Sequence, residues 1–244
     1  MGVLTVSLII FSKTAWAQTS GIPKITVDIE QSKKPEDVAV SLQILFAMTI
    51  LSLAPAIIIL MTSFTRILVV FHFIRQALGT QQMPANQILI GLALFLTFFI
   101  MTPVWQEINR DSLQPFLQEE ISDKEALERA QLPIHNFMLK LVREKDLALF
   151  VKFADMEKPQ TRDDIPLRVL IPAFVTSELR IAFQIGFILY VPFLMIDMIV
   201  ASVLMSMGML MLPPIMISLP FKVLLFILVD GWYMIVNSVV QSFT

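Results

Sequence analysis

The chain has 244 residues, of which 56% are hydrophobic and 16% are charged, and its mean hydropathy is +0.76. This composition lies outside the range of soluble globular domains and predicts an all-α, multispan membrane protein. A net charge of −2 gives no basic field for nucleic acid, and the absence of cysteine excludes disulfides, thiolate metal sites and a cysteine nucleophile.

The N-terminal residues have the pattern of a secretory signal peptide. A short apolar core, Val3 to Phe11, precedes Ala15-Trp16-Ala17, which has the small-x-small form of a signal-peptidase site. Lys13 follows the core instead of preceding it, so an uncleaved first anchor is the alternative. The core is too short to cross about 30 Å of hydrocarbon. We therefore predict a signal peptide over residues 1–17 and a polar periplasmic leader over 18–40.

Residues 41–104 are predicted to form a first hydrophobic hairpin. Leu42 to Met61 is uncharged and long enough for one span, which Pro55 should kink. The pattern continues amphipathically as far as Gly79, and Ile88 to Val104 is a second, shorter apolar run. The two runs supply the first pair of hydrophobic helices.

Residues 105–172 are polar overall and helical in pattern. Ser122 and Glu125 form a capping box at the start of one helix, and Pro133 can occupy the first turn of another. Two narrow apolar faces follow, made by Ile134, Phe137, Met138, Leu141 and Val142, and by Leu147, Phe150, Val151 and Ala154. So small a region makes a poor independent core, so we expect both faces to pack against neighbouring copies of the chain.

Residues 173–244 are predicted to form a second hydrophobic hairpin, with helices over Ile181 to Met207 and Ile215 to Val240. The chain thus has four hydrophobic helices in two hairpins. A cleaved signal peptide would place the leader outside, the 75–87 turn inside, the region 105–172 outside and the 206–214 turn inside. Cations near the first turn agree with this orientation.

Charged residues within these apolar segments need partners, because an unpaired charge at the centre of a span costs about 2.5 to 3.5 kcal/mol. If the second hairpin turns near Leu210, Asp197 and Lys222 lie level, and an ion pair follows. A proton relay and a pairing with another subunit are the alternatives. Asp230 would lie opposite Tyr190 and accept a hydrogen bond from it.

Three further charged residues, Arg66, Glu178 and Arg180, flank or interrupt apolar runs. Lipid-facing spans do not accommodate an acid at mid-depth, so such residues should face protein or an aqueous path. They are candidates for subunit contacts or for the wall of a pore.

Methionines are concentrated where the third hydrophobic helix ends. The cluster comprises Met205, Met207, Met209, Leu210 and Met211. Methionine commonly fills irregular gaps in apolar cores. Here the unbranched side chains gather at a turn that Pro213 prevents from being helical. Copies arranged in a ring would direct several thioethers at one axis, where they would form a deformable seal.

No enzymatic motif is present. Neither His72 nor His135 has a second ligand at metal-binding spacing, there is no His-Glu-x-x-His pattern, and no phosphate-binding glycine loop occurs. We predict a non-enzyme without a metal or cofactor.

With these residues in view, the chain resembles the FliP family, membrane components of the flagellar type III protein export gate. The resemblance extends from Leu42 to the C-terminus. The matching stretches are Pro172–Phe187, Pro192–Ser202, Ser206–Pro214 and Leu219–Trp232. The resemblance implies a core subunit of a channel that exports unfolded flagellar proteins and is needed for flagellum assembly, at the basal body in the bacterial inner membrane.

The resemblance also implies an assembly. About five copies of the chain would form a ring-like or helical complex with FliQ-like, FliR-like and FlhB-like membrane subunits. In such a complex the hydrophobic helices are drawn largely out of the bilayer plane toward the periplasm. Membrane lipid and unfolded secreted proteins are the other implied partners.

Family members are described as closing their pore with a methionine-rich loop, which here corresponds to Met209-Leu210-Met211. Leu210 departs from an all-methionine loop, and its similar volume implies a working but stiffer seal. The alternative function is a proton-coupled transporter that uses Asp197 and Asp230 as carriers. Asp197→Asn separates the two, because only a carrier depends on protonation of that acid.

Overall fold

The computed structural model describes residues 35–80, 82–156, 161, 164–209 and 211–243, with side chains from residue 40 onward. The predicted signal peptide and most of the predicted leader lie outside this part of the chain. Every regular element within it is helical, which confirms the all-α prediction. The chain divides into two compact units, residues 1–49 and 50–244.

Helix α1, Pro35–Leu60, crosses the boundary between the units. In the first unit, its side chains from Val40 to Thr49 are all exposed in the single chain. It is one of three helices that are long and apolar enough to cross a membrane, over Val40–Leu60. The other two cover Asn86–Leu117 and Leu167–Ser206.

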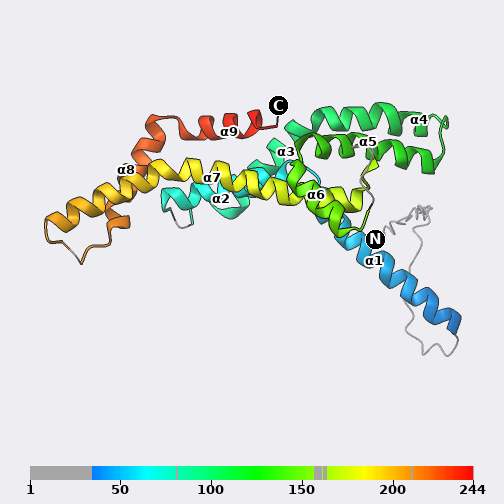
Figure 1. Cartoon of the computed structure of the whole chain (residues 1–244), viewed down its shortest axis with the longest axis horizontal. Coiled ribbons are helices and arrows are strands. Elements are labelled where there is room, and N and C mark those ends of the chain that lie inside the picture. Colours follow the sequence, from blue (N-terminus) through cyan, green and yellow to red (C-terminus); the bar gives the residue numbers. More distant parts are fainter. Residues whose placement is uncertain (1–34, 81, 157–160, 162–163, 210, 244) are drawn as a thin grey trace, which may run out of the picture. The chain divides into compact units, whose positions relative to one another are not determined.

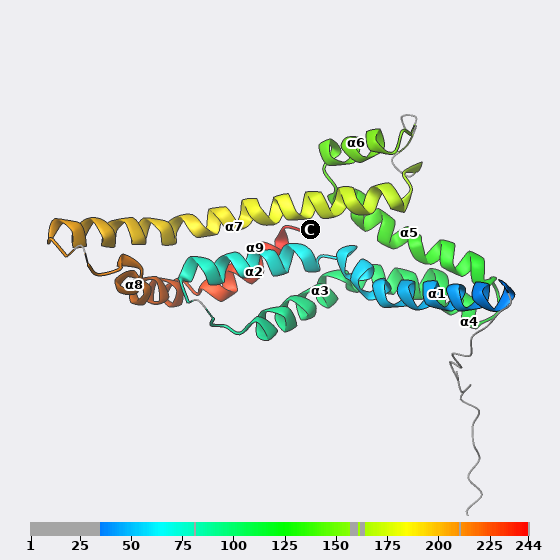
Figure 2. The same ribbon diagram turned by 90° about the horizontal axis from the view of Figure 1, so that it is seen from below.

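The second unit contains the remaining helices (Figure 1). In chain order they are α2 Phe64–Leu78, α3 Asn86–Ile108, the π-helical turn Asn109–Leu113, α4 Gln114–Leu117, α5 Asp123–Leu141, α6 Glu144–Phe153, α7 Leu167–Ser206, α8 Pro214–Leu228 and α9 Gly231–Gln241. Helix α7 is the longest, and α2 packs along it (Figure 2).

The fourth hydrophobic segment is bent. Helices α8 and α9 meet at 65°, and the pair counts as a fourth span only if the two are taken together. This corrects the prediction of one continuous helix over Ile215 to Val240. At the break, Asp230 adopts a left-handed conformation with φ of 50°. A Cβ on Gly231 would lie 2.3 Å from the ring of Phe226, so the bend depends on a residue without a side chain.

Helix α2 organises the main core. Its buried side chains recur every three or four residues, as predicted for an amphipathic helix. The core they join is made by Ile67, Val70, Phe71, Ile74, Ala77, Leu78, Leu89, Ala93, Ala182, Phe193, Phe226, Ile235, Val239 and Phe243. Contact between α2 and α7 is close, since a Cβ on Gly186 would lie 2.5 to 2.9 Å from atoms of Phe73.

The region 105–172 differs from expectation in its helix boundaries. The hydroxyl of Ser122 accepts a hydrogen bond from the Glu125 amide at 3.3 Å, so the predicted cap is confirmed. Pro133 was expected to begin a new helix, but α5 continues through it to Leu141. A proline removes one hydrogen bond of the helix, and here Met138, which is fully buried, anchors the turns that follow.

The apolar faces of α5 and α6 pack within the chain. They form a second core with the first turns of α7, made by Met138, Leu139, Val142, Leu147, Ile165, Val169, Leu170, Ala173 and Phe174. The expectation that both faces await neighbouring copies was therefore wrong for these residues. The reason is the length of α7, whose 40 residues begin at Leu167 and supply the missing apolar partner. Ala154, at the end of the second predicted face, is exposed.

Candidate functional site

The second hairpin, α7 with α8, carries the predicted ion pair. Lys222 Nζ lies 2.6 Å from Asp197 Oδ2, and only 3% of Lys222 is exposed. The two residues are 25 apart in sequence. They meet because α7 and α8 pack against each other as a helical hairpin joined by a short loop. The register inferred from the sequence is confirmed at this level of the hairpin.

Two further groups complete this polar cluster. The hydroxyl of Ser218, which is fully buried, donates to Asp197 Oδ1. Lys222 Nζ also donates to the carbonyl oxygen of Ala77, in the last turn of α2, at 3.1 Å. We call Ala77, Asp197, Ser218 and Lys222 the lysine clamp. It joins three helices, α2, α7 and α8, through one ammonium group.

Sequence reasoning missed two members of the lysine clamp. Ser218 precedes Lys222 by one helical turn, so the spacing did place both on one face of α8. Ala77 contributes only its backbone, which no residue pattern reveals.

The loop after α7 begins with a well-formed helix end. Gly208 has φ of 74° and its amide donates to the Met205 carbonyl at 3.1 Å, while the Met209 amide donates to the Leu204 carbonyl at 3.0 Å. This pair of bonds is the Schellman motif, which satisfies the last carbonyls of a helix. Helix α8 then starts at Pro214.

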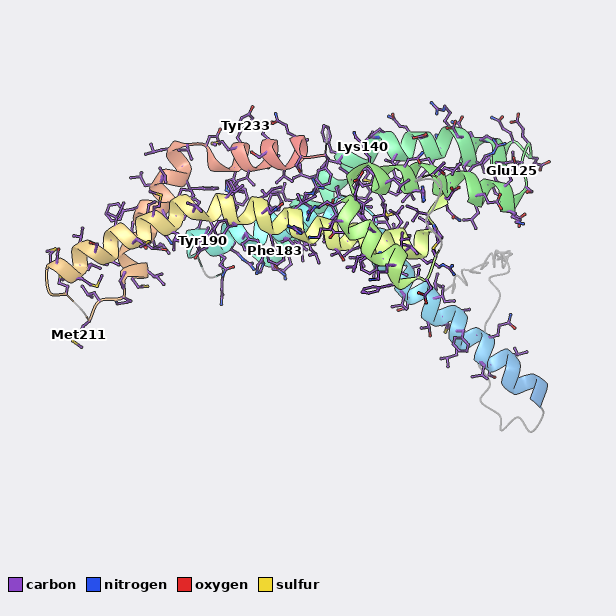
Figure 3. The ribbon with its side chains drawn as sticks, in the orientation of Figure 1. Glu125, Lys140, Phe183, Tyr190, Met211 and Tyr233 are labelled. Carbon is purple, nitrogen blue, oxygen red and sulfur yellow. The ribbon has the colours of Figure 1, made fainter. Side chains whose placement is uncertain are left out.

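The methionines of this segment are not part of a core in the single chain. Met205, Met207 and Met209 are exposed, and Met211 is 98% exposed. Met211 stands at the end of the hairpin, away from the packed helices (Figure 3). Leu210 lies outside the described residues. We call residues 205–213 the methionine loop.

Asp230 does not have the environment expected from the sequence. It is exposed in the single chain and occupies the break between α8 and α9. In the part of the chain that the structure describes, its carboxylate makes no hydrogen bond with Tyr190. The expected register assumed a straight fourth helix, and the 65° bend takes Asp230 out of it.

Arg66 and Glu178 pair with each other inside the protomer. Arg66 Nε donates to Glu178 Oε2 at 2.8 Å, Nη2 donates to Oε1, and the side chains are 2% and 0% exposed. Arg66 Nη1 also donates to the carbonyl oxygen of Ser242 at 2.7 Å, and the guanidinium lies 3.9 Å from the ring centroid of Phe243. The expectation that Arg66 and Glu178 face a pore or a subunit is corrected, because their partners lie within the chain.

Arg180 is exposed and remains a candidate for a subunit contact. Next to Glu178, the fully buried Ser177 connects α7 to the start of α6. Its hydroxyl donates to Asp146 Oδ2 at 2.8 Å and accepts from the Arg143 amide at 3.1 Å. Adjacent residues of α7 thus hold two different parts of the protomer.

Each of the two histidines makes a polar contact within the chain. His72 Nδ1 lies 3.0 Å from Arg75 Nη2, and His135 Nε2 lies 2.7 Å from the Ile165 carbonyl oxygen. Among the described residues, no group of three or more His, Cys, Asp or Glu side chains is placed to hold a metal ion.

Comparison with known proteins agrees with the sequence resemblance. A model of the FliP family matches residues 47–239. The flagellar biosynthetic protein FliP of Bacillus subtilis (strain 168) is 58% identical over 217 residues, which cover 89% of this chain and 98% of that protein. Those of Pectobacterium carotovorum subsp. carotovorum and Aquifex aeolicus (strain VF5) are each 48% identical, covering 98% and 92% of this chain and 92% and 93% of their own length.

The apolar helices with charges paired in their interior define a helical membrane protein whose second hairpin ends in an exposed loop. This class includes anchors, transporters and channels. The chain belongs to the FliP family and is a component of the flagellar export apparatus. The comparisons give no support to the alternative of a proton-coupled transporter.

Proposed function

We propose that the chain is a channel-forming subunit of the flagellar export apparatus and that the methionine loop is the gate of the channel. The observation that carries this proposal is the contrast between the loop and its support. Met211 is almost wholly exposed, whereas Ser218 and Lys222 of the lysine clamp, which holds the two helices behind it, are buried. An exposed apolar loop on a fixed base is suited to meeting its counterparts from other copies.

The chemistry of the loop suits a reversible seal. Thioether side chains are unbranched and polarizable, so they pack against irregular surfaces without specifying one arrangement. A ring of apolar side chains also excludes ions by expelling water from the constriction. Such a seal can part around an unfolded polypeptide and close after it. Leu210 would contribute similar volume with less flexibility.

Exposed apolar surface supports an assembly of about five copies with FliQ-like, FliR-like and FlhB-like subunits. An open apolar groove of about 450 Å³ runs along the second hairpin, lined by residues that include Ile199, Val203 and Phe221. Monomeric soluble proteins rarely expose such continuous apolar surface. In the assembly these faces contact neighbouring subunits or lipid, and the chain contributes structure to the channel instead of catalysis.

The proposed location is the bacterial inner membrane at the flagellar basal body, with the leader and the region 105–172 in the periplasm. Apolar helices covered by other subunits and apolar helices covered by lipid have the same composition. The hydrophobic helices can therefore lie above the bilayer plane in the assembly, as the family resemblance implies.

The gate is tested with Met209→Ala combined with Met211→Ala. The smaller side chains leave a gap at the constriction, so ion conductance of the assembled complex in a planar bilayer should rise. Met195→Ala combined with Met198→Ala is the matched control, because both methionines are exposed on α7 away from the loop. Unchanged conductance in the loop variant would contradict the gate.

The wider function is tested in a motile bacterium that lacks this gene. Hook protein and flagellin should be missing from the medium and return with a plasmid copy. Normal secretion of both proteins without the gene would contradict a channel role.

A further inference from the structure

The C-terminal end of α2 is docked at the base of the methionine loop by a polar contact. The ammonium group of Lys222 donates to the Ala77 carbonyl oxygen at 3.1 Å while it pairs with Asp197 at 2.6 Å. Lys222 therefore does more than join α7 to α8. It also fixes both of them to a third helix.

A cation is favoured at this end of α2. The last carbonyls of a helix lack partners within the helix and carry partial negative charge. The Gly79 amide satisfies the Gln76 carbonyl, and Lys222 satisfies the Ala77 carbonyl. This bond gives a reason for the cation of the ion pair to lie on α8 and the acid on α7.

Gly79, the residue after α2, faces the start of α8 across a recess. A Cβ placed on Gly79 would lie 4.0 Å from Ile215 Cγ2 and 4.0 Å from Lys222 Nζ. Ile215 is the second residue of α8, two residues after Pro213, which ends the methionine loop. The recess, of about 400 Å³, is lined by His72, Arg75, Gln76, Gly79 and Ile215. The end of α2 thus bonds to α8 at the lysine clamp and faces the first turn of α8 across this recess.

Beyond the clamp, the hairpin has little else to hold it. In the described part of residues 202–217, the side-chain hydrogen bonds are local: Ser206 Oγ donates to the Val203 carbonyl at 2.7 Å, and Ser218 Oγ of the lysine clamp donates to the Ile215 carbonyl at 3.2 Å. Met205, Met207 and Ile215 are all exposed. In the single chain, the direction in which the methionine loop points therefore depends on how the base is held.

We propose that Lys222 is a positioning residue that couples α2 to the gate, by capping the Ala77 carbonyl and so holding the base of the methionine loop in its closed position. Ser218 assists by orienting Asp197. This inference rests on the proposed role of the loop as a gate. It predicts that an ion pair alone is insufficient, and that the position of the positive charge on α8 is what matters.

A charge swap separates the two contributions of Lys222. Asp197→Lys combined with Lys222→Asp keeps an ion pair between α7 and α8 but presents a carboxylate to the Ala77 carbonyl. Lys222→Met removes both interactions. Arg129→Met is the matched control, since it removes a cation from a 2.6 Å ion pair on the exposed face of α5.

The docking itself is measured by spin labels at Gln76→Cys and Met216→Cys. The chain has no other cysteine, and both positions are exposed. The parent and Arg129→Met should give one narrow distance between the labels. The swap and Lys222→Met should each give a broadened or displaced distribution. A distribution in the swap as narrow as that of the parent would overturn the coupling.

The effect on the gate is measured by ion conductance of the purified complex. The conductance of the swap should be roughly tenfold higher than that of the parent. This is the change expected when the closed state of the gate loses one hydrogen bond to a charged group and the open state does not. If Met209→Ala with Met211→Ala leaks and the swap does not, the coupling is wrong and the gate stands. If neither leaks while the spin-label distance broadens, the docking stands and the gate is wrong.

Should the swap fail to assemble, Asp197→Asn decides the matter. It removes the ion pair but leaves the Lys222 ammonium group at the Ala77 carbonyl, so this variant should hold the spin-label distance better than Lys222→Met. Equal broadening in the two variants would overturn the proposed cap.

Discussion

The two ends of α7 satisfy their polar groups in different ways. Near the N-terminal end, Ser177 and Glu178 are fully buried and bonded to α6 and α2. Near the other end, Asp197 makes the only polar side-chain contacts with another helix in the described residues 187–206, and most large apolar side chains there are exposed. The polar groups at one end are enclosed within the protomer, while the other end leaves most of its large apolar side chains exposed in the single chain.

The largest expected effect is at the buried end. Arg66→Met would leave Glu178 fully buried without its cation, and removing one partner of a buried pair costs about 3 to 5 kcal/mol. The midpoint of thermal unfolding of the purified chain should fall sharply. Arg180→Met, at an exposed arginine of the same helix as Glu178, should change it little.

Adding Glu178→Met to Arg66→Met should recover part of the lost stability, because no charge then remains unpaired in the core. A double variant no more stable than Arg66→Met would show that the hydrogen bonds to Ser242, and not the ion pair, dominate this site.

The next effect concerns the close contact between α2 and α7. Gly186→Ala would place a methyl group 2.5 to 2.9 Å from atoms of Phe73, and such overpacking costs about 1 to 3 kcal/mol. Gly91→Ala is the matched control, since no atom lies within 4 Å of its added methyl. Denaturant unfolding of both variants measures the difference. Equal stability would mean that Phe73 moves aside at no cost.

The last effect is at Ser177 and is local to the attachment of α6. Ser177→Ala removes the bond to Asp146 and leaves the Arg143 amide without its acceptor, at about 1 to 3 kcal/mol. Hydrogen exchange at the start of α6 should become faster while that of α2 is unaffected. Thr176→Ala, whose hydroxyl bonds only to the Pro172 carbonyl on an exposed face, should leave both unchanged. Faster exchange in both helices would show that the two attachments of α7 are not independent.

Sequence reasoning was most successful where the outcome depends on local periodicity. The pairing of Asp197 with Lys222 follows from two regular helices around a short loop, so counting from the turn was sufficient. The cap at Ser122 and the amphipathic face of α2 are equally local. These features require at most that two helices consecutive in the sequence pack against each other.

The errors share one physical cause, which is that tertiary contacts are not encoded in local spacing. Arg66 and Glu178 are 112 residues apart, and nothing near either residue indicates the other. The helix through Pro133 is held by packing on α7 that the local pattern cannot show. Asp230 was misplaced because a left-handed residue before Gly231 bends a segment whose composition resembles a straight span.

The contacts between Arg66 and the last described residues affect how the protomer can be made. Ser242 follows Arg66 by 176 residues, and Phe243 stacks on Phe137 of α5 with ring centroids 6.5 Å apart. During synthesis, Arg66 therefore has its full set of partners only after another 176 residues have been added. Contacts of such long range slow folding and leave partly folded chains exposed to misassembly. The order in which residues leave the ribosome is thus not the order in which this site can form.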